Sequence, residues 1–347
     1  MLDTWLIEVE DAYRRPLSIK KEEIKEKVKE VVKEVVKAEA FTIDESLIDR
    51  KNWEEHYVRK GDPSKPTYYI IRRFSATVRL FAIFILVAGH IRYALSKNWI
   101  PVVDMQNYSN FYLAPEKLGK ENSWEYYFEQ PLRIGLKEAY SGENIVLSTG
   151  QFVPFPQFNG VAIYESKEYQ APWRMLVKKG FLRVKKDLQK EIIAIREKLF
   201  APTDRVLGVN LRGTDYVVKK PKNHPIPPSM SLAKNTVAEK LKEWNCNKIF
   251  LATEDKTIVQ EFKTTFGDLC VTIDREYIEY DPKTWITENL IDRENDVYLQ
   301  GKDYLIETYL LSMCNSFVAA KSNSVACLMF LTENFENTFV FNLGLYT

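Results

Sequence analysis

RVLGVNL (205–211) and KIFLAT (248–253) are short apolar stretches, and the segment between them at 229–244 has the periodicity of a helix. Strands and helices that alternate in this way are typical of a parallel sheet with helices on both faces. The alternation continues toward the C-terminus, with predicted elements at 256–266 (helix), 269–273 (strand), 303–314 (helix), 316–319 (strand), 324–331 (helix) and 338–342 (strand). The second half of the chain is therefore predicted to be an α/β domain.

The first half of the chain repeats this pattern less regularly. Its predicted elements are helices at 20–37, 74–95 and 178–200 and strands at 100–104 and 144–148. Pro172 is expected in a connection between elements. A length of 347 residues suggests about two domains. We expect an α/β domain with a helical N-terminal extension at 1–178 and a Rossmann-like domain at 179–347.

The composition excludes several classes of protein. Hydrophobic residues make up 45% of the chain and charged residues 28%, which is ordinary for a globular protein. Lys and Arg (49) almost balance Asp and Glu (48), so nonspecific nucleic-acid binding is not expected and any anion site has to be local. The 4 cysteines form no CxxC pair, and there are only 3 histidines. We therefore expect no metal centre and a reducing compartment.

Two further features bear on localisation. The first residues lack the basic region of a signal peptide, and the most apolar run, at 80–89, is shorter than the roughly 20 residues that a spanning helix needs. We therefore expect a cytoplasmic protein. The basic helix at 178–198 is either a solvated helix between the domains or a patch for peripheral attachment to the inner membrane.

Polar side chains follow three of the predicted strands, at 205–211, 248–253 and 316–319. Ligands of open α/β sheets bind at the carboxyl ends of the strands, so these residues are expected to line one pocket. They are Asn210, Arg212, Asp215 and Tyr216 after the first strand, Thr253, Glu254 and Asp255 after the second, and Lys321, Ser322, Asn323 and Ser324 after the third.

The residue types in this set suit a pyrophosphate. Arg212 presents a planar fork of donors for phosphate oxygens, and Gly213 allows close approach of the backbone. The 322–324 cluster lies where the N-terminus of a helix exposes backbone N–H groups. In an alternative interpretation, Arg212 pairs with Asp215 or Glu254 in a structural network and the serines only cap the helix.

Several common motifs are absent from the sequence. It contains no GxxxxGK[ST] phosphate loop, no GxGxxG, no GxSxG, no HExxH and no DxD pair. Phosphate charge would then have to be neutralised by Arg, by Lys and by helix N-termini.

Five short segments share their order and spacing with a known family. They are GVNLRGTD (208–215), HPI (224–226), FLATED (250–255), LLSMC (310–314) and SNSV (322–325). These segments resemble the GDP-fucose-binding half of the α1,6-fucosyltransferases, which include the core N-glycan enzymes and the rhizobial nodulation enzymes. The first half is more weakly similar to bacterial members of the wider superfamily, at FS (74–75), PVVD (101–104) and NSWEYYFEQP (122–131).

The resemblance implies a GT-B architecture, in which two Rossmann-like domains face a central cleft. It also implies an inverting, metal-independent glycosyltransferase that moves a sugar, foremost fucose, from a GDP-sugar to a hydroxyl of a surface glycan or lipid-linked oligosaccharide. The first domain would hold the acceptor and the second the GDP-sugar, which is a substrate, so no cofactor is expected. Alternatives are another GDP-sugar such as mannose or heptose, a non-catalytic nucleotide-sugar or glycan-binding protein on the same fold, and an unrelated α/β enzyme with a chance match.

The same resemblance implies roles for the candidate residues. Arg212 would bind the β-phosphate, and Asp215 would hold Arg212 or the sugar. Glu254 and Asp255 would contact the nucleoside, and the 322–324 cluster would complete the pyrophosphate site. The remaining candidates are His224 in the wall near the nucleotide, Glu307 either in the cleft or in an intrahelical salt bridge, and Asn210, Tyr216, Thr253 and Lys321 as further substrate-binding residues.

Two departures from the family remove one cation. Asn210 stands where the family usually has His, and Gly213 stands where it has a second Arg. Lys219 or Lys321 is a candidate replacement.

A third departure concerns the catalytic base. The family places a Glu five residues after the motif Asp, and that position is Lys220 here. Asp215 and Asp104 are the remaining carboxylate candidates, because a hydroxyl acceptor has to lose a proton. Asp104, at the end of a predicted strand, could instead cap a turn.

Overall fold

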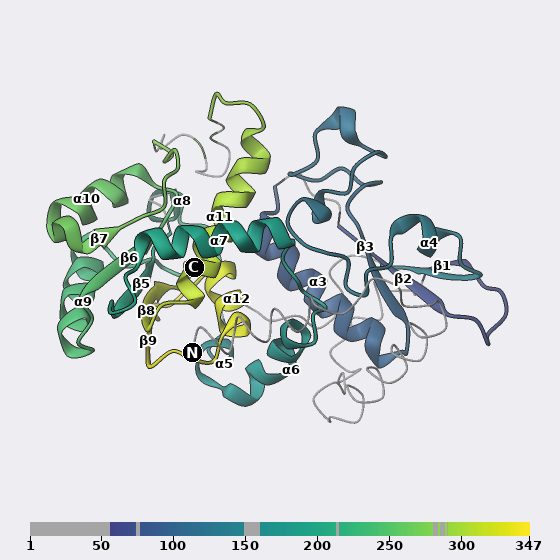
Figure 1. Cartoon of the computed structure of the whole chain (residues 1–347), viewed down its shortest axis with the longest axis horizontal. Helices are drawn as coiled ribbons and strands as arrows, with labels where there is room; N and C mark the ends of the chain where they lie inside the picture. The colour runs from purple at the N-terminus through teal and green to yellow at the C-terminus, as the bar shows by residue number, and fades with distance from the viewer. Residues whose placement is uncertain are drawn as a thin grey trace.

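The computed structural model describes residues 56–73, 77–148, 160–212, 215–279, 284, 289 and 291–347. The predicted helix at 20–37 lies outside these residues. Two sheets form the frame of the molecule, and helices pack around them (Figure 1). The predicted α/β class is confirmed.

The second sheet has the strand order β7-β6-β5-β8-β9, and its neighbouring strands are all parallel. Its strands are β5 (Val206–Asn210), β6 (Lys248–Ala252), β7 (Cys270–Val271), β8 (Ser316–Ala320) and β9 (Asn337–Phe341). The connecting elements are α8 (Asp215–Lys219), α9 (Met230–Glu243), α10 (Lys256–Phe266), η5 (Gly267–Leu269), α11 (Asp296–Ser312) and α12 (Asn323–Leu331). The strand order reverses between β5 and β8, and ligands of such sheets bind beyond the strand ends at this point.

The first sheet has the order β1-β4-β2-β3, with β1 antiparallel to β4 and the other pairs parallel. Its elements are β1 (His56–Arg59), β2 (Thr67–Arg72), α3 (Leu80–Ser96), β3 (Ile100–Asp104), η3 (Pro115–Lys117), η4 (Ser123–Tyr126), α4 (Leu136–Tyr140) and β4 (Asn144–Leu147). The sequence analysis found β3, β4 and α3 but not β1 or β2.

Three helices connect the two sheets: α5 (Ala162–Glu165), α6 (Lys167–Lys178) and α7 (Lys186–Leu199). Two predictions here are wrong. Pro172 lies inside α6, where its side chain is buried, and the helix predicted at 178–200 begins only at Lys186. The preceding turn buries Phe181 and Leu182, so tertiary packing determines its conformation.

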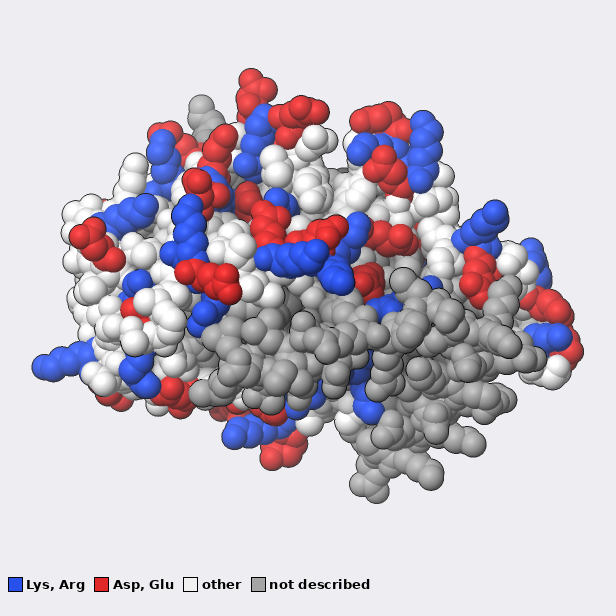
Figure 2. Space-filling view, in the orientation of Figure 1, with Lys and Arg blue, Asp and Glu red and all other residues white. Residues whose placement is uncertain are grey.

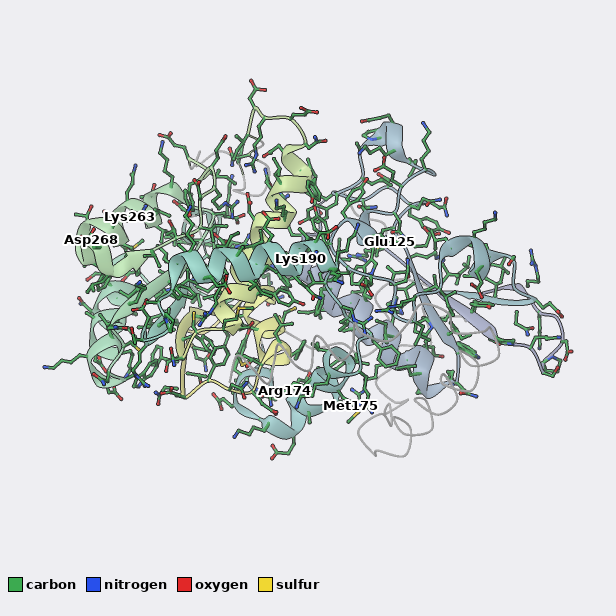
Figure 3. All side chains as sticks on the ribbon, in the orientation of Figure 1. Glu125, Arg174, Met175, Lys190, Lys263 and Asp268 are labelled. Carbon is green, nitrogen blue, oxygen red and sulfur yellow. The ribbon has the colours of Figure 1, made fainter. Side chains whose placement is uncertain are left out.

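The helix α6 packs on the second domain. Trp173 lies 5.9 Å from the ring of Phe330 in α12, and Arg174 (labelled in Figure 3) donates from Nε to the carbonyl oxygen of Met329 at 2.9 Å. The domain boundary between residues 178 and 179 stays a prediction. The contacts show that α6, at the end of the predicted first domain, packs against α12 of the second.

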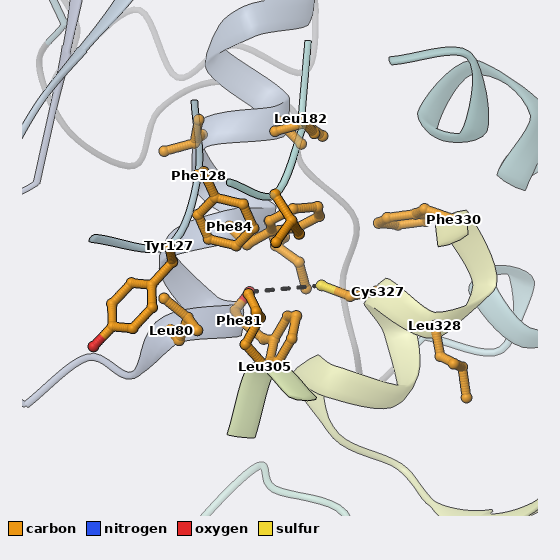
Figure 4. Packing of buried hydrophobic residues seen from close by; sticks show 14 of the residues in the cluster. Leu80, Phe81, Phe84, Tyr127, Phe128, Leu182, Leu305, Cys327, Leu328 and Phe330 are labelled. Carbon is orange, nitrogen blue, oxygen red and sulfur yellow. Dashed lines mark hydrogen bonds between the residues drawn. The ribbon is translucent and has the colours of Figure 1, made fainter. Parts of the chain in front are cut away.

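A hydrophobic core continues from one domain into the other (Figure 4). The helix α3 is buried on almost every side, and its Phe81 ring lies edge-on to Tyr304 of α11 at 4.9 Å. The thiol of Cys327 in α12 lies 3.8 Å from the carbonyl oxygen of Phe81. The two sheets are therefore joined by buried apolar contacts as well as by the chain.

Acidic and basic side chains are interspersed on the described part of the face shown in Figure 2. Glu191 of α7 forms an ion pair with Lys302 of α11, with 2.7 Å between Oε1 and Nζ. Within the ranges that the structure describes, no helix combines the length and the apolar character needed to cross a bilayer.

Candidate functional site

A pocket lies beyond the carboxyl ends of β5, β6 and β8, at the point where the strand order reverses. Its walls come from these three strand ends, from the N-terminus of α12 and from one face of α11. The lining residues are Asn210, Leu211, Arg212, Thr253, Glu254, Tyr304, Glu307, Ser322 and Ser324. The structure thus brings together seven of the residues that the sequence analysis singled out.

Arg212 follows β5 and is held by an aromatic side chain. Its guanidinium carbon lies 4.1 Å from the ring centroid of Tyr216, the second residue of α8. The ring of His224 meets Tyr216 edge-on at 5.5 Å, so the imidazole supports the aromatic wall at some remove from the pocket. Stacking of this kind covers a face of the guanidinium, whereas its N–H donors lie in the plane of the group. Tyr216 thereby fixes the orientation of the Arg212 guanidinium at the edge of the pocket.

The two acidic residues after β6 have different positions. Glu254 lines the pocket. Asp255 is fully buried and caps α10, because its carboxylate accepts hydrogen bonds from the backbone N–H groups of Thr257 (2.8 Å) and Ile258 (3.3 Å). The structure therefore does not bring the Asp255 side chain to the pocket.

The end of β8 forms a hydroxyl-lined helix N-terminus. Ser322 caps α12 by accepting from the backbone N–H of Val325 at 3.3 Å, and its hydroxyl lies 3.0 Å from that of Ser324. Asn323, the first residue of α12, is partly exposed and does not line the pocket. Backbone N–H groups at such a terminus favour an anion.

Lys321 points elsewhere. Its ammonium group donates to Oδ1 of Asn342 at 2.9 Å and lies 5.8 Å from the ring centroid of Tyr164. Burial lowers the pKa of this amine. Lys321 does not line the pocket, so it does not supply the replacement cation proposed from the sequence.

Glu307 enters the pocket from α11 and is almost completely buried. Its Oε2 lies 3.3 Å from Nη1 of Arg275, whereas its Oε1 is buried with no hydrogen-bond partner among the described residues. The expectation of an intrahelical salt bridge is wrong, since Arg275 lies outside α11. Burial raises the pKa of Glu307 to about 8, with Arg275 acting in the opposite direction.

Sequence reasoning missed two residues of this region. Arg275, whose side chain is 2% exposed, follows β7, and the strand-end rule applied to that strand would have found it. Tyr304 lies three residues before Glu307 and therefore on the same face of α11. Residues three or four positions from a predicted site residue lie on the same helical face, so Tyr304 could have been predicted from Glu307.

Asp104 lies in the first domain and makes the contacts of a turn cap. Its Oδ1 accepts from the backbone N–H groups of Gln106 (2.9 Å) and Asn107 (3.0 Å). Its Oδ2 accepts from the Asn107 amide at 2.8 Å and from the Tyr140 hydroxyl at 2.6 Å. With four hydrogen bonds and no exposed surface, this carboxylate has the alternative role that its strand-end position suggested. Asp215 opens α8, and its side chain lies outside the described part.

The fold is similar to that of the NodZ α1,6-fucosyltransferase co-crystallized with GDP, at a TM-score of 0.50 and 12% identity, over 80% of this chain and 96% of the other. The chain has the fold of NodZ. The expected GT-B architecture is thereby confirmed. Weaker likenesses are to NodZ from Bradyrhizobium (TM-score 0.46, 14% identity, 81% and 96% covered) and to POFUT1 in complex with GDP (TM-score 0.47, 9% identity, 81% and 99% covered).

No protein-family model and no curated protein sequence matches the chain. In the described ranges, no group of three or more His, Cys, Asp or Glu side chains gathers closely enough to hold a metal ion.

Proposed function

We propose that the protein is a glycosyltransferase that uses a GDP-sugar, foremost GDP-fucose, as donor. The observation that carries this proposal is the convergence of Arg212, Glu254, Glu307 and the α12 N-terminus in one pocket. That pocket lies where doubly wound sheets bind nucleotides, in a chain with the fold of a protein that was co-crystallized with GDP.

The proposed nucleotide site divides into two parts. Arg212 and the α12 N-terminus, with Ser322 and Ser324, suit the diphosphate, because they offer a guanidinium, hydroxyls and backbone N–H groups. Glu254 and Glu307 suit the nucleoside. Guanine presents two adjacent N–H donors on one edge, and an ionised carboxylate accepts from both. A bound guanine would therefore hold Glu307, whose Oε1 has no partner among the described residues, in its ionised form and lower the pKa that burial raises.

In the proposed reaction, the bond between the anomeric carbon and the β-phosphate oxygen breaks, and its electron pair stays on the GDP. An acceptor hydroxyl oxygen bonds to the same carbon from the opposite face, so the configuration at this carbon is inverted. The hydroxyl gives its proton to a base. Arg212 and the α12 N-terminus would stabilise the charge that develops on the leaving diphosphate, so the scheme requires no metal. Asp215 stays the predicted base, because the carboxylate of Asp104 is occupied by four hydrogen bonds.

The proposed acceptor is the hydroxyl of a surface glycan or a lipid-linked oligosaccharide. The first domain contains a hollow of about 650 Å³ lined by amide, carboxyl, ammonium and phenol groups, which are the groups that bind sugars. The lining includes Gln106, Asn107, Glu125, Tyr126 and Lys137. We propose that the reaction takes place in the cytoplasm. The basic residues of 178–198 could attach the protein to the inner membrane, and this is a separate hypothesis to test.

Calorimetry tests the nucleotide site. The wild-type protein, with a chelator present, is titrated with GDP, GDP-fucose and UDP, beside Arg212→Ala and the control Arg205→Gln. Arg205 pairs with Glu336 at the opposite end of the same sheet. We expect GDP and GDP-fucose to bind, UDP to bind more weakly, and Arg212→Ala alone to lose at least about 100-fold in affinity.

The outcomes separate the candidate functions. Wild-type protein that does not bind GDP would contradict the proposal. Tight GDP binding without GDP release from GDP-fucose in the presence of a panel of glycan acceptors would favour the non-catalytic alternative, a nucleotide-sugar-binding protein on the same fold.

A further inference from the structure

Arg79 lies at the junction of the two domains, immediately before α3. Its guanidinium carbon lies 3.4 Å from the ring centroid of Phe111 in the first domain. Its Nη1 donates to Oε1 of Gln300 in α11 of the second domain, at 3.3 Å. The side chain is therefore held between an aromatic ring from one domain and an amide from the other.

The remaining donors of Arg79 are unsatisfied. Both Nε and Nη2 are buried, and neither makes a hydrogen bond of ordinary geometry among the residues that the structure describes. The nearby Tyr112 hydroxyl interacts with the guanidinium, but it already accepts from the backbone N–H of Leu80 at 2.9 Å and carries no charge. Buried donors in folded proteins are nearly always paired, with protein, water or ligand, and a charged group has the greatest need of a partner. Two such N–H groups on one fork indicate that an anion belongs there.

The position of Arg79 relates this anion to the pocket described above. Gln300, which holds Arg79, shares one face of α11 with Tyr304 and Glu307, at intervals of four and three residues. Phe81, two residues after Arg79, packs against the ring of Tyr304 at 4.9 Å. Arg79 thus contacts a residue of α11 that lies about one helical turn before Tyr304, which lines the pocket.

The electrostatics agree with this position. Burial lowers the pKa of Arg79; Tyr112 and the charge of Glu254 raise it, and the charge of Arg212 lowers it. Glu254 and Arg212 line the pocket, so the guanidinium lies within its field. A diphosphate brings two to three negative charges into a pocket that already contains Glu254. Arg212 is the one arginine among the lining residues in the described part of the chain and cannot balance them alone.

We propose that Arg79 is a second cation for the diphosphate of the donor, supplied by the first domain. The donor would then be held by both domains at once, and its binding would depend on the junction at which α3 meets α11. This inference rests on the proposed function, because it takes the ligand of the pocket to be a nucleoside diphosphate.

The test separates the diphosphate from the nucleoside. Wild-type protein, Arg79→Gln, Arg79→Lys and the control Arg205→Gln are titrated with GDP and with guanosine at two salt concentrations. We expect Arg79→Gln to weaken GDP binding about 10- to 100-fold and guanosine binding less than about threefold. Arg79→Lys keeps the positive charge but not the planar fork of donors, so its GDP affinity should lie between those of the wild type and Arg79→Gln. Salt should weaken GDP binding less in Arg79→Gln than in the wild type, because one charge contact is gone.

The outcomes distinguish failure of this inference from failure of the proposed function. Wild-type protein that binds no GDP would end the proposed function and this inference together. Equal GDP affinity in the wild type and in Arg79→Gln would overturn the inference and leave the proposed function intact. Parallel losses of GDP and guanosine binding in Arg79→Gln and Arg79→Lys, or a lowered melting temperature in both, would show that Arg79 only supports the junction.

Discussion

The guanidinium of Arg275 and the carboxylate of Glu307 form a buried ion pair, with 3.3 Å between Nη1 and Oε2. The two side chains are only 2% and 4% exposed. Arg275 also lies 3.6 Å from Asp303, so one guanidinium serves two carboxylates. Glu307 is therefore fixed in place by a residue of the loop after β7, while its second oxygen is left for another partner.

The pKa of Glu307 makes the stability of the protein depend on pH. The pKa is raised from 4.5 to about 8 in the folded state, so the folded protein binds a proton that the unfolded protein releases between these values. The stabilisation that this bound proton gives the folded protein is fully present below pH 4.5 and is lost as pH rises toward 8. We expect Glu307→Gln to remove up to about 1.4 kcal/mol per pH unit of this decline.

Urea unfolding from pH 5 to 9 measures this effect, because groups that do not interact with Glu307 cancel in the difference between wild type and variant. Glu333→Gln serves as the control, since Glu333 is an exposed partner of Lys178 and its pKa is lowered. Parallel stability curves for wild type and Glu307→Gln over this range would contradict the prediction.

Local pattern identified the strand ends that line the pocket. The strands β5, β6 and β8 could be predicted because each is a short apolar run followed by polar residues, and parallel strands bring such ends to one edge. Arg212, Glu254 and Ser322 accordingly meet in the pocket. Glu254 and Asp255 could not be told apart, because capping depends on where α10 begins.

Other features depend on tertiary contacts that local sequence does not encode. Arg79 and Arg275 have partners on α11 that are distant in sequence. The predicted helix at 178–200 was too long because periodicity alone did not reveal that the turn before Lys186 is fixed by buried side chains. The strand β2 was missed since its run at 67–72 leads directly into a segment that was read as one helix.

Phe81→Ala should destabilise both domains together. The Phe81 side chain is fully buried in a core that includes residues of both domains, and truncation of such a ring leaves a cavity that costs about 3–5 kcal/mol. Urea unfolding, followed by tryptophan fluorescence and circular dichroism, should give one transition with a lower midpoint. Leu232→Ala is the control, because Leu232 is 40% exposed. Two separate transitions, with only one moved by Phe81→Ala, would show that the domains unfold independently.

Tyr216→Leu should weaken GDP binding by removing the ring on which Arg212 lies. A cation–π contact contributes about 0.5–2 kcal/mol, which corresponds to a loss of about 2- to 30-fold in affinity. Tyr216→Phe keeps the ring and should bind GDP like the wild type. Calorimetry of the three proteins decides the matter, and an equal loss in both variants would assign the effect to the phenol hydroxyl.

Asp104→Asn should lower stability and leave the reaction unchanged. The amide keeps one oxygen for the backbone N–H groups of Gln106 and Asn107 but places an NH₂ group against the Asn107 amide. We expect the free energy of unfolding to fall by about 1–3 kcal/mol. The rate of GDP release from GDP-fucose should stay within about threefold, whereas loss of a general base lowers such rates by about 10²- to 10⁴-fold. Tyr140→Phe is the matched control, since it removes the hydroxyl that donates to Oδ2 at 2.6 Å and cannot alter a proton transfer by Asp104 directly. A collapse of the rate in Asp104→Asn, with the rate of Tyr140→Phe intact, would make Asp104 the base despite its four hydrogen bonds.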